Sequence, residues 1–315
     1  MINNVDKKRF STQYIGRYAP SPTGRLHLGN LRTALLAWLH ARLNDGIFLL
    51  RFDDLDTPRV VKGSDQQIIN DLQWLGLDWD GDIYYQSENI HRYQNALSKL
   101  SSQSRVYPCF CSRKDIQQAV SAPHTQLAAY PGTCRYLSQQ QRAEKRQHKK
   151  PALRYRVDDN LVSFVDLLYG NQHDNLSTSS GDFVIKRADG LFAYQLAVVI
   201  DDITQNINTV VRGADLQSSS ARQVALFDAF DSEAPTYMHV PLLMNRSGER
   251  MAKRDGSDSV SSWQKEKKTP QQLIAYLAKS VGLIDDINQC SAKELLDYVN
   301  LESFYHALLT QRSAI

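Results

Sequence analysis

Two strand–helix pairs follow one another near the start of the chain, and this alternation constrains the fold more than any other feature. An extended stretch at 14–20 precedes a helix predicted from Leu28 to Leu43, where apolar residues recur at helical spacing. The dense apolar run at 47–52 predicts a strand buried on both faces, and 65–77 predicts another helix. Strands that alternate with helices pair in parallel, since a parallel crossover needs a helix-length connection. The sequence therefore predicts an α/β fold with a parallel sheet.

The strand–helix alternation is interrupted after about 100 residues. The segment 105–181 holds three of the four cysteines and the basic run RAEKRQHKK at 142–150. We therefore predict an inserted subdomain at 105–181, between the two parts of one larger domain at 12–104 and 182–257. A helical region is predicted at 258–315.

The composition is that of a soluble globular protein, with 42% apolar and 23% charged residues. No apolar stretch is long enough to span a bilayer, and residues 1–13 lack the apolar core of a signal peptide. We therefore expect a cytoplasmic protein with no membrane partner, acting as a monomer. The formal charge of +3 permits a polyanionic partner without requiring one.

The stretch PSPTGRLHLGN at 20–30 lies between the first strand and its helix. In open α/β sheets, ligands bind at the carboxyl ends of strands, where helix N-termini present amide donors. Gly24 and Gly29 let a ligand approach the backbone, and His27 adds a donor near the positive end of the helix dipole. These residues predict a phosphate-facing site, and an ordinary surface turn is the alternative.

A cationic loop at 249–257 is the second feature that points to a nucleotide. It carries Arg250, Lys253 and Arg254 and contains Gly256. Such a loop could close on a triphosphate and stabilise charge on leaving pyrophosphate, whereas a solvated charge run is the alternative. The presence of both features in this order favours the nucleotide site.

These segments resemble the H-I-G-H and K-M-S-K-S signatures of class I aminoacyl-tRNA synthetases. GRYAPSPTGRLHLGNLRTAL, RFDDLDTPR, DGLFAYQLAVVIDD and VVRGADL together resemble the catalytic core of glutamyl-tRNA synthetases, from about Tyr14 to Gly256. The resemblance implies a Rossmann-like, doubly wound parallel sheet and activation of an amino-acid carboxylate by ATP with Mg²⁺. It implies that His27 and Lys253 are catalytic, and that ATP is bound by His27, Gly29, Asn30 and Lys253.

The residues around the predicted strand ends fit a substrate with two carboxylates and one ammonium. Arg17 and Arg212 suit bidentate carboxylate binding, and Asp53 suits the ammonium. For Asp54 and Asp56 we favour a structural ion network at the sheet edge. The resemblance assigns L-glutamate to Arg17, Ala19, Ser21, Asp53, Tyr194 and Arg212.

The chain departs from the family pattern in a few positions. Asp53 stands where a glutamate is usual, and Asn30 replaces the second histidine of the first signature. Arg250 and Ala252 replace a lysine and a serine of the second signature, while Lys253 is retained.

Three cysteines lie close together in the predicted insertion: Cys109 and Cys111 in YPCFCSRKD, and Cys134 in AAYPGTCR. In a reducing compartment they suggest one structural Zn²⁺, which takes four ligands, and buried free thiols are the alternative. Tyr130 or His124 could be the fourth ligand. The spacing resembles the zinc site of glutamyl-queuosine tRNA(Asp) synthetases, which implies the set Cys109, Cys111, Tyr130 and Cys134. Cys290 is expected in the core.

The segment after Gly256 is too short for the large anticodon-binding domain of an ordinary glutamyl-tRNA synthetase. With the tyrosine-containing zinc pattern, this implies the glutamyl-queuosine type, which activates glutamate without tRNA and transfers it to the queuosine of tRNA(Asp). Alternatives are a conventional synthetase acting on a tRNA 3′ end, a small-molecule nucleotidyltransferase, or a catalytically weak RNA-binding relative. The basic runs at 142–150 and 265–268 could face RNA phosphates, and solvated faces are equally compatible.

Overall fold

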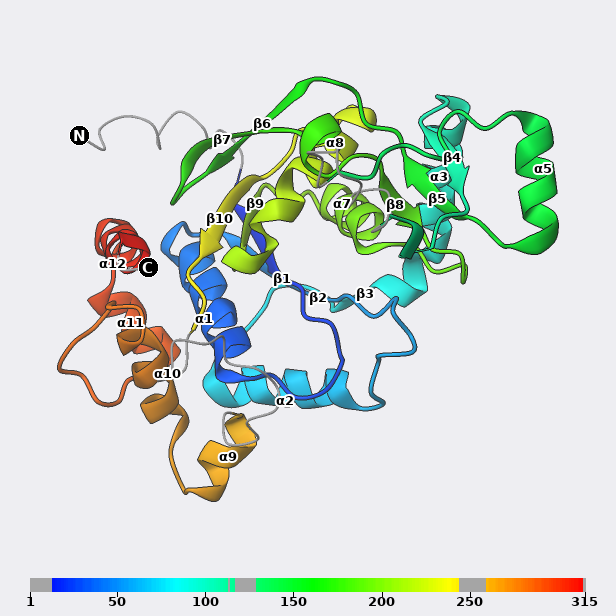
Figure 1. Ribbon diagram of the computed structural model, residues 1–315. Helices are drawn as coiled ribbons and strands as arrows, with labels where there is room; N and C mark the ends of the chain where they lie inside the picture. Colours follow the sequence, from blue (N-terminus) through cyan, green and yellow to red (C-terminus); the bar gives the residue numbers. More distant parts are fainter. Residues whose placement is uncertain (1–12, 113, 117–128, 244–258, 314–315) are drawn as a thin grey trace.

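The computed structural model describes residues 13–112, 114–116, 129–243 and 259–313 (Figure 1). Two sheets of the main body are built mostly from parallel strands. The first has the order β1-β2-β3 and the second the order β7-β6-β10-β9. Their strands are β1 Ile15–Tyr18, β2 Ile47–Phe52, β3 Tyr84–Tyr85, β6 Leu161–Asp166, β7 Gly170–Asn175, β9 Thr209–Gly213 and β10 Thr236–Val240.

The two sheets meet where β1 lies beside β9. The backbone N–H of Ile15 donates to Oδ1 of Asn208, and the N–H of Asn208 donates to the carbonyl of Ile15, both at 3.0 Å. From β1 the chain crosses to β2 on one side, and from β9 it crosses to β10 on the other. This reversal is the switch point of a doubly wound sheet, where a crevice opens at the carboxyl ends of the strands. The predicted parallel α/β fold is confirmed.

Helices connect and cover these strands because their apolar residues recur at helical spacing. The long helix α1 is buried on most of its surface, so it behaves as a core helix rather than an amphipathic one. The helices of the main body are α1 Leu28–Leu43, α2 Ser64–Leu75, α3 Ile90–Ser102, α6 Leu176–Ser179, α7 Tyr194–Thr204 and α8 Ser220–Ala229, with 3₁₀ turns η1 Gln86–Asn89 and η2 Ala214–Ser219.

A separate antiparallel sheet is formed by β4 Val106–Cys109, β5 Ala152–Tyr155 and β8 Phe183–Lys186. Helix α5, Gln139–His148, projects from this part of the molecule and buries none of its side chains (Figure 1). The sheets do not follow the predicted boundaries of the 105–181 insertion. Strands β6 and β7 lie within that range yet extend the sheet of β9 and β10, while β8 lies outside it and pairs with β5. The sequence of β7, GNQHDN, lacks apolar alternation, which is compatible with its place at a sheet edge.

The C-terminal helices pack on α1 and share its core. Leu273 and Leu277 of the first long C-terminal helix and Phe304 of the last are fully buried in the same apolar cluster as α1. Cys290, at 2% exposure, belongs to this cluster as predicted. The helical region therefore contributes to the core of the main body (Figure 1). Its helices are α9 Val260–Lys265, α10 Pro270–Lys279, α11 Ala292–Tyr298 and α12 Leu301–Ser313.

Candidate active site

A cavity of about 340 Å³ opens at the switch point between β1 and β9. Its walls come from the ends of these strands, the segment 19–30, and the first residue of α7. The structure brings nine of the predicted site residues together around it: Arg17, Ala19, Ser21, His27, Gly29, Asn30, Asp53, Tyr194 and Arg212. The ligand roles of these residues stay predictions. Lys253, with Arg250 and Arg254, lies outside the described residues.

His27 is the N-cap of α1. Its Nδ1 accepts a hydrogen bond from the backbone N–H of Asn30 at 3.3 Å, which assigns the proton of the neutral ring to Nε2. A Cβ on Gly29 would lie 3.0 Å from two atoms of this ring, so the glycine permits the ring's position over the first turn. No acidic residue lies in the first turn of α1. The imidazole and the helix N-terminus together favour an anion at this end of the cavity.

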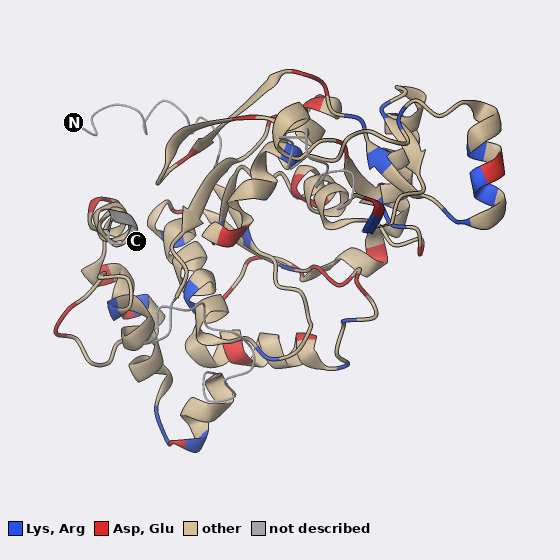
Figure 2. Ribbon diagram, viewed as in Figure 1, with Lys and Arg blue, Asp and Glu red and all other residues tan. Residues whose placement is uncertain are grey.

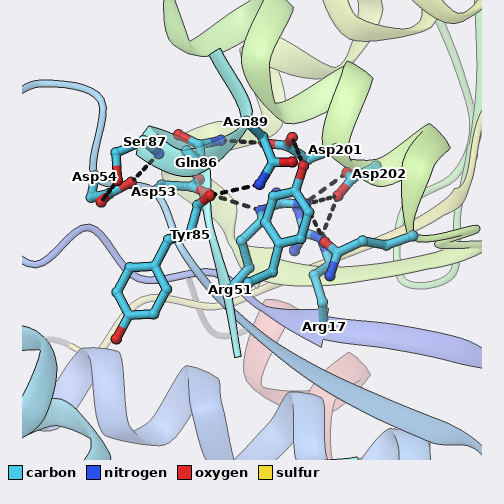
Figure 3. A network of polar contacts seen from close by, with 12 residues as sticks. Arg17, Arg51, Asp53, Asp54, Tyr85, Gln86, Ser87, Asn89, Asp201 and Asp202 are labelled. Atoms are coloured by element: carbon cyan, nitrogen blue, oxygen red, sulfur yellow. Dashed lines mark hydrogen bonds and ion pairs between the residues drawn. The ribbon is translucent and has the colours of Figure 1, made fainter. Parts of the chain in front are cut away.

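Below the cavity floor, Asp202 of α7 joins two buried arginines (Figure 3). Its Oδ1 accepts from Nε of Arg17 at 3.1 Å and from Nη1 of Arg51 at 2.6 Å. Arg51 also donates from Nε to Oδ1 of Asp53 at 2.9 Å. These four side chains balance two positive with two negative charges, and all are nearly inaccessible to solvent. Such burial is tolerated only because each charge has a counter-charge.

The two aspartates of this cluster have opposite pKa shifts. Burial opposes the ionisation of Asp202, but Arg17 and Arg51 outweigh it and hold its pKa below the ordinary value. For Asp53, burial and the nearby charge of Asp201 outweigh Arg51 and the weaker effect of Arg17, and the pKa rises to about 6. Asp53 lines the cavity, so a cationic group there would give it a second positive partner.

Asp201, the neighbour of Asp202, belongs to a different set of contacts. It accepts hydrogen bonds from the hydroxyls of Tyr84 and Tyr93, each at 2.9 Å, and from the amide of Gln86 at 2.7 Å. Burial raises its pKa. These three donors attach β3, η1 and α3 to α7, which is a structural task.

Asp54 and Asp56 also have structural partners, but only Asp56 forms the predicted ion pairs. Asp54 accepts from the backbone N–H of Ser87 at 2.8 Å, and Asp56 pairs with Arg187 at 3.0 Å and with Arg59. Neither aspartate lines the cavity.

Arg212, near the end of β9, is 5% exposed and also lines the cavity. Its Nε donates to Nε2 of His239 at 3.0 Å, and its Nη1 donates to Oε1 of Gln223 at 2.8 Å. His239 in turn bonds through Nδ1 to Oδ2 of Asp166. Tyr194 is 38% exposed at the start of α7, where its position at the cavity wall agrees with the prediction.

Sequence reasoning missed Asp202, His239 and Asp166, which hold the cavity arginines in place. A signal for Asp202 is present in the sequence. The run LAVVIDD places two carboxylates directly after five apolar residues, and a buried carboxylate requires a cation or several donors. His239 lies between apolar neighbours in YMHVPLL, a pattern that also suits an ordinary buried histidine.

The predicted metal ligands form a second site, in the sheet β4-β5-β8. The sulfurs of Cys109, Cys111 and Cys134 lie within 4.8 Å of one another, and those of Cys111 and Cys134 are 3.6 Å apart. The phenol oxygen of Tyr130 lies 3.3 Å from Cys109 Sγ and 3.8 Å from Cys111 Sγ. A tetrahedron with Zn–S arms of about 2.3 Å has edges of about 3.8 Å, so the four atoms fit a zinc site. His124 lies outside the described residues.

The backbone around Tyr130 depends on one glycine. Gly181 has φ of +64°, and a Cβ there would lie 2.5 Å from the carbonyl oxygen of Tyr130. The guanidinium of Arg154 lies 3.7 Å from the centre of the Tyr130 ring. The close approach of the Gly181 and Tyr130 backbones and the stacking of Arg154 on the ring together hold the phenol beside the cysteines.

Both predicted basic runs are exposed. The first forms most of α5, where Figure 2 marks several Lys and Arg positions in blue. Lys149, just after this helix, donates to the carbonyl of Phe110 at 2.7 Å. The second follows α9, where Lys268 lies over the ring of Trp263. Exposure agrees with either of the two interpretations. None of the helices in the described part of the chain has the length and apolarity needed to cross a membrane.

Comparison with known proteins assigns the fold to one class of enzyme. The family model for the catalytic domain of class I tRNA synthetases (E and Q) matches residues 14–310. A crystal structure of glutamate-tRNA synthetase from Elizabethkingia anophelis superimposes with a TM-score of 0.78 at 26% identity, over 93% of this chain and 66% of that longer one. The fold is thus that of a class I synthetase catalytic core.

The curated relatives narrow this class. The glutamyl-Q tRNA(Asp) synthetase of Nocardia farcinica is 49% identical over 269 residues, 85% of each chain. That of Symbiobacterium thermophilum is 42% identical over 298 residues, 91% of this chain and 92% of the relative. The chain belongs to the family of glutamyl-Q tRNA(Asp) synthetases, and it is an enzyme of the ligase class.

The buried cluster under the cavity predicts a large effect of removing its shared carboxylate. Asp202→Asn leaves Arg17 and Arg51 with one carboxylate between them, and we expect unfolding free energy to fall by about 3–5 kcal/mol. Urea unfolding measures this change. Asp231→Asn, which breaks the exposed pair with Lys99, is the control and should cost at most about 1 kcal/mol. Equal, small losses in both variants would contradict the structural role of Asp202.

Proposed function

We propose that this chain activates L-glutamate with ATP, in the absence of tRNA, and then transfers the glutamyl group to queuosine in the anticodon of tRNA(Asp). In the first step a carboxylate oxygen of glutamate attacks the α-phosphorus, the bond from the α-phosphorus to the α,β-bridging oxygen breaks, and pyrophosphate leaves with the bonding electrons. In the second step a hydroxyl of the queuosine cyclopentenediol attacks the acyl carbon, and AMP leaves with the bonding electrons. Both steps need positioning and charge stabilisation rather than a protein nucleophile.

One observation carries this proposal: the cavity combines Arg17, Arg212 and Asp53 with the N-terminus of α1. Two cations and one anion complement the two carboxylates and the ammonium of glutamate. His27 at the helix N-terminus is suited to phosphate oxygens, which are the charged groups of the second substrate. The names of the relatives support the same assignment.

The remaining parts of the catalytic apparatus are assigned by the family pattern. Lys253 would hold the β- and γ-phosphates and stabilise pyrophosphate as it leaves. Mg²⁺ bound to ATP would neutralise phosphate charge during the attack. Asn30, which donates its backbone N–H to His27, lines the ATP end of the cavity with Gly29.

A structural Zn²⁺ is the second cofactor that we propose. The donor set of three sulfurs and one phenol oxygen would surround the ion completely, which leaves no open position for catalysis. The ion would join the end of β4 to the segment 130–134. We propose the protein works as a cytoplasmic monomer, with queuosine-containing tRNA(Asp) as its RNA partner.

The activation step is tested by glutamate-dependent exchange between pyrophosphate and ATP. Zinc-loaded protein should catalyse this exchange without tRNA. Lys253→Ala should lose most of the rate because the charge on pyrophosphate is no longer stabilised, whereas Cys290→Ala, in the core, should lose little. A folded wild-type protein without exchange refutes the proposal, and equal losses in both variants indicate damage to the fold instead.

The transfer step is tested by glutamylation of tRNA(Asp), which should require queuosine in the anticodon. Transfer without queuosine favours a conventional synthetase.

The raised pKa of Asp53 predicts a pH dependence. Above about pH 6 the carboxylate is ionised and attracts the substrate ammonium, and below it the group is neutral. We therefore expect kcat/KM for glutamate to fall by up to about tenfold per pH unit below this pKa. Exchange assays between pH 5 and 8 measure it. Asp53→Asn should have a low kcat/KM without this inflection, and an inflection that persists in this variant assigns it to another group.

The metal proposal predicts one zinc per chain by elemental analysis. Tyr130→Phe removes the phenol oxygen but keeps the ring under Arg154, so zinc affinity should fall by about tenfold or more while the fold remains. The matched control is Tyr107→Phe, which removes a buried hydroxyl bound to Asp182 at 2.6 Å and should retain zinc affinity. Competition with a chelator measures both. Unchanged affinity in Tyr130→Phe would exclude tyrosine as the fourth ligand.

A further inference from the structure

Arg212 is a buried cation whose hydrogen-bond partners are all neutral. Its Nε donates to His239 at 3.0 Å, its Nη1 to Gln223 at 2.8 Å, and its Nη2 to Ser220 at 2.9 Å and to the carbonyl of Leu216 at 3.4 Å. Within the described part of the chain, no carboxylate forms an ion pair with it. Asp215 lines the same cavity but forms no ion pair with Arg212. A buried guanidinium without a carboxylate bonded to it is costly, so this part of the cavity favours an anionic ligand.

Arg17, on β1, has the opposite arrangement. Its Nε pairs directly with Oδ1 of Asp202 at 3.1 Å, so much of its charge is compensated by the protein. Arg17 and Arg212 therefore differ in the charge that they offer to a ligand in the cavity. Arg212 has the larger share of charge available for a substrate carboxylate, although Arg17 retains donors for hydrogen bonds.

The reason for the neutral surroundings of Arg212 is the position of His239. This side chain is fully buried and lies between Arg212 and Asp166, which is also fully buried. Asp166 is fixed in turn, because its Oδ1 accepts from the backbone N–H groups of Leu168 at 2.9 Å and Tyr169 at 3.0 Å. The carboxylate holds the proton of the imidazole on Nδ1, so Nε2 accepts from Arg212.

An aromatic face completes the arrangement. The guanidinium of Arg212 lies 4.9 Å from the centre of the Tyr237 ring, and this ring stacks on the imidazole of His239 with an interplanar angle of 14°. The ring and the imidazole thus restrict both the plane and the direction of the guanidinium. Burial lowers the pKa of His239, which agrees with a neutral imidazole in this position.

We propose that His239 is a positioning residue for the glutamate carboxylate: it separates Asp166 from Arg212, fixes the orientation of the guanidinium, and leaves its charge for the substrate. This inference rests on the proposed function, since it specifies how one wall of the same cavity binds glutamate. In place of His239, a carboxylate in direct contact would neutralise Arg212, and an apolar residue would leave its Nε unpaired.

Two amides of different length test the proposal. His239→Asn keeps an amide near Nδ1 that can donate to Asp166, but it is too short to accept from Arg212. His239→Gln extends one methylene further and restores an acceptor for Nε. We expect the KM for glutamate to rise by about tenfold or more in the Asn variant and by less than about threefold in the Gln variant. In both variants the KM for ATP should stay within about twofold of wild type, because His27 and α1 are unaffected.

His40→Gln is the matched control. His40 is also a buried histidine with both ring nitrogens bonded, to Tyr14 at 2.9 Å and to Tyr305 at 2.8 Å, but it lies on α1 away from the cavity lining. It should lower the melting temperature without changing the KM for glutamate.

Steady-state pyrophosphate exchange and thermal unfolding on the full chain give all of these values. Equal KM values for glutamate in the Asn and Gln variants, or a parallel rise in the KM for ATP, would overturn the inference. Wild-type protein without glutamate-dependent exchange would instead refute the proposed function, so the two failures are distinguishable.

Discussion

The shared carboxylate of Asp202 is the interaction on which the rest of the site depends. It connects α7 to the ends of β1 and β2 through Arg17 and Arg51, and the three side chains are almost fully buried. Each of these groups alone would be costly to bury, but together they are compensated. This cluster fixes the floor of the cavity, and it determines which donors of Arg17 remain for a ligand.

On this floor, the electrostatics of the cavity follow from how each charge is compensated. Asp53 has one arginine and a raised pKa, so a further cation stabilises it. Arg212 has neutral partners, so an anion stabilises it. The N-terminus of α1 and His27 together favour a third group, the oxygens of a phosphate. A zwitterionic dicarboxylate and a polyphosphate together satisfy all three, which is why the chemistry of glutamate activation fits this cavity.

The part of the molecule around the sheet β4-β5-β8 is stabilised in a different way. Tyr155, Phe183 and Ile185 of this sheet belong to the large core cluster of α7 and α8. The region around the cysteines has a separate, small cluster that consists largely of Tyr107, Phe110, Tyr130 and the cysteines. A cluster of this size stabilises little by burial alone. A metal bound by the sulfurs and the phenol would supply the missing cross-link, and Asp182 already joins this part through Tyr107 and the backbone of Val157.

The parallel α/β fold, the position of His27 at the start of the first helix, the close set of cysteines and the polar residues at strand ends could be predicted from the sequence. These depend on local periodicity or on short spacings, which the sequence displays directly. It did not reveal that β6 and β7 join the main sheet, because β7 has no apolar alternation. Nor did it assign partners to the buried charges. Arg17 and Asp202 are 185 residues apart, and Arg212 and His239 are 27 apart on adjacent parallel strands. Which arginine is neutralised and which keeps its charge follows only from the three-dimensional structure, because charge compensation depends on contacts between distant parts of the chain and on desolvation.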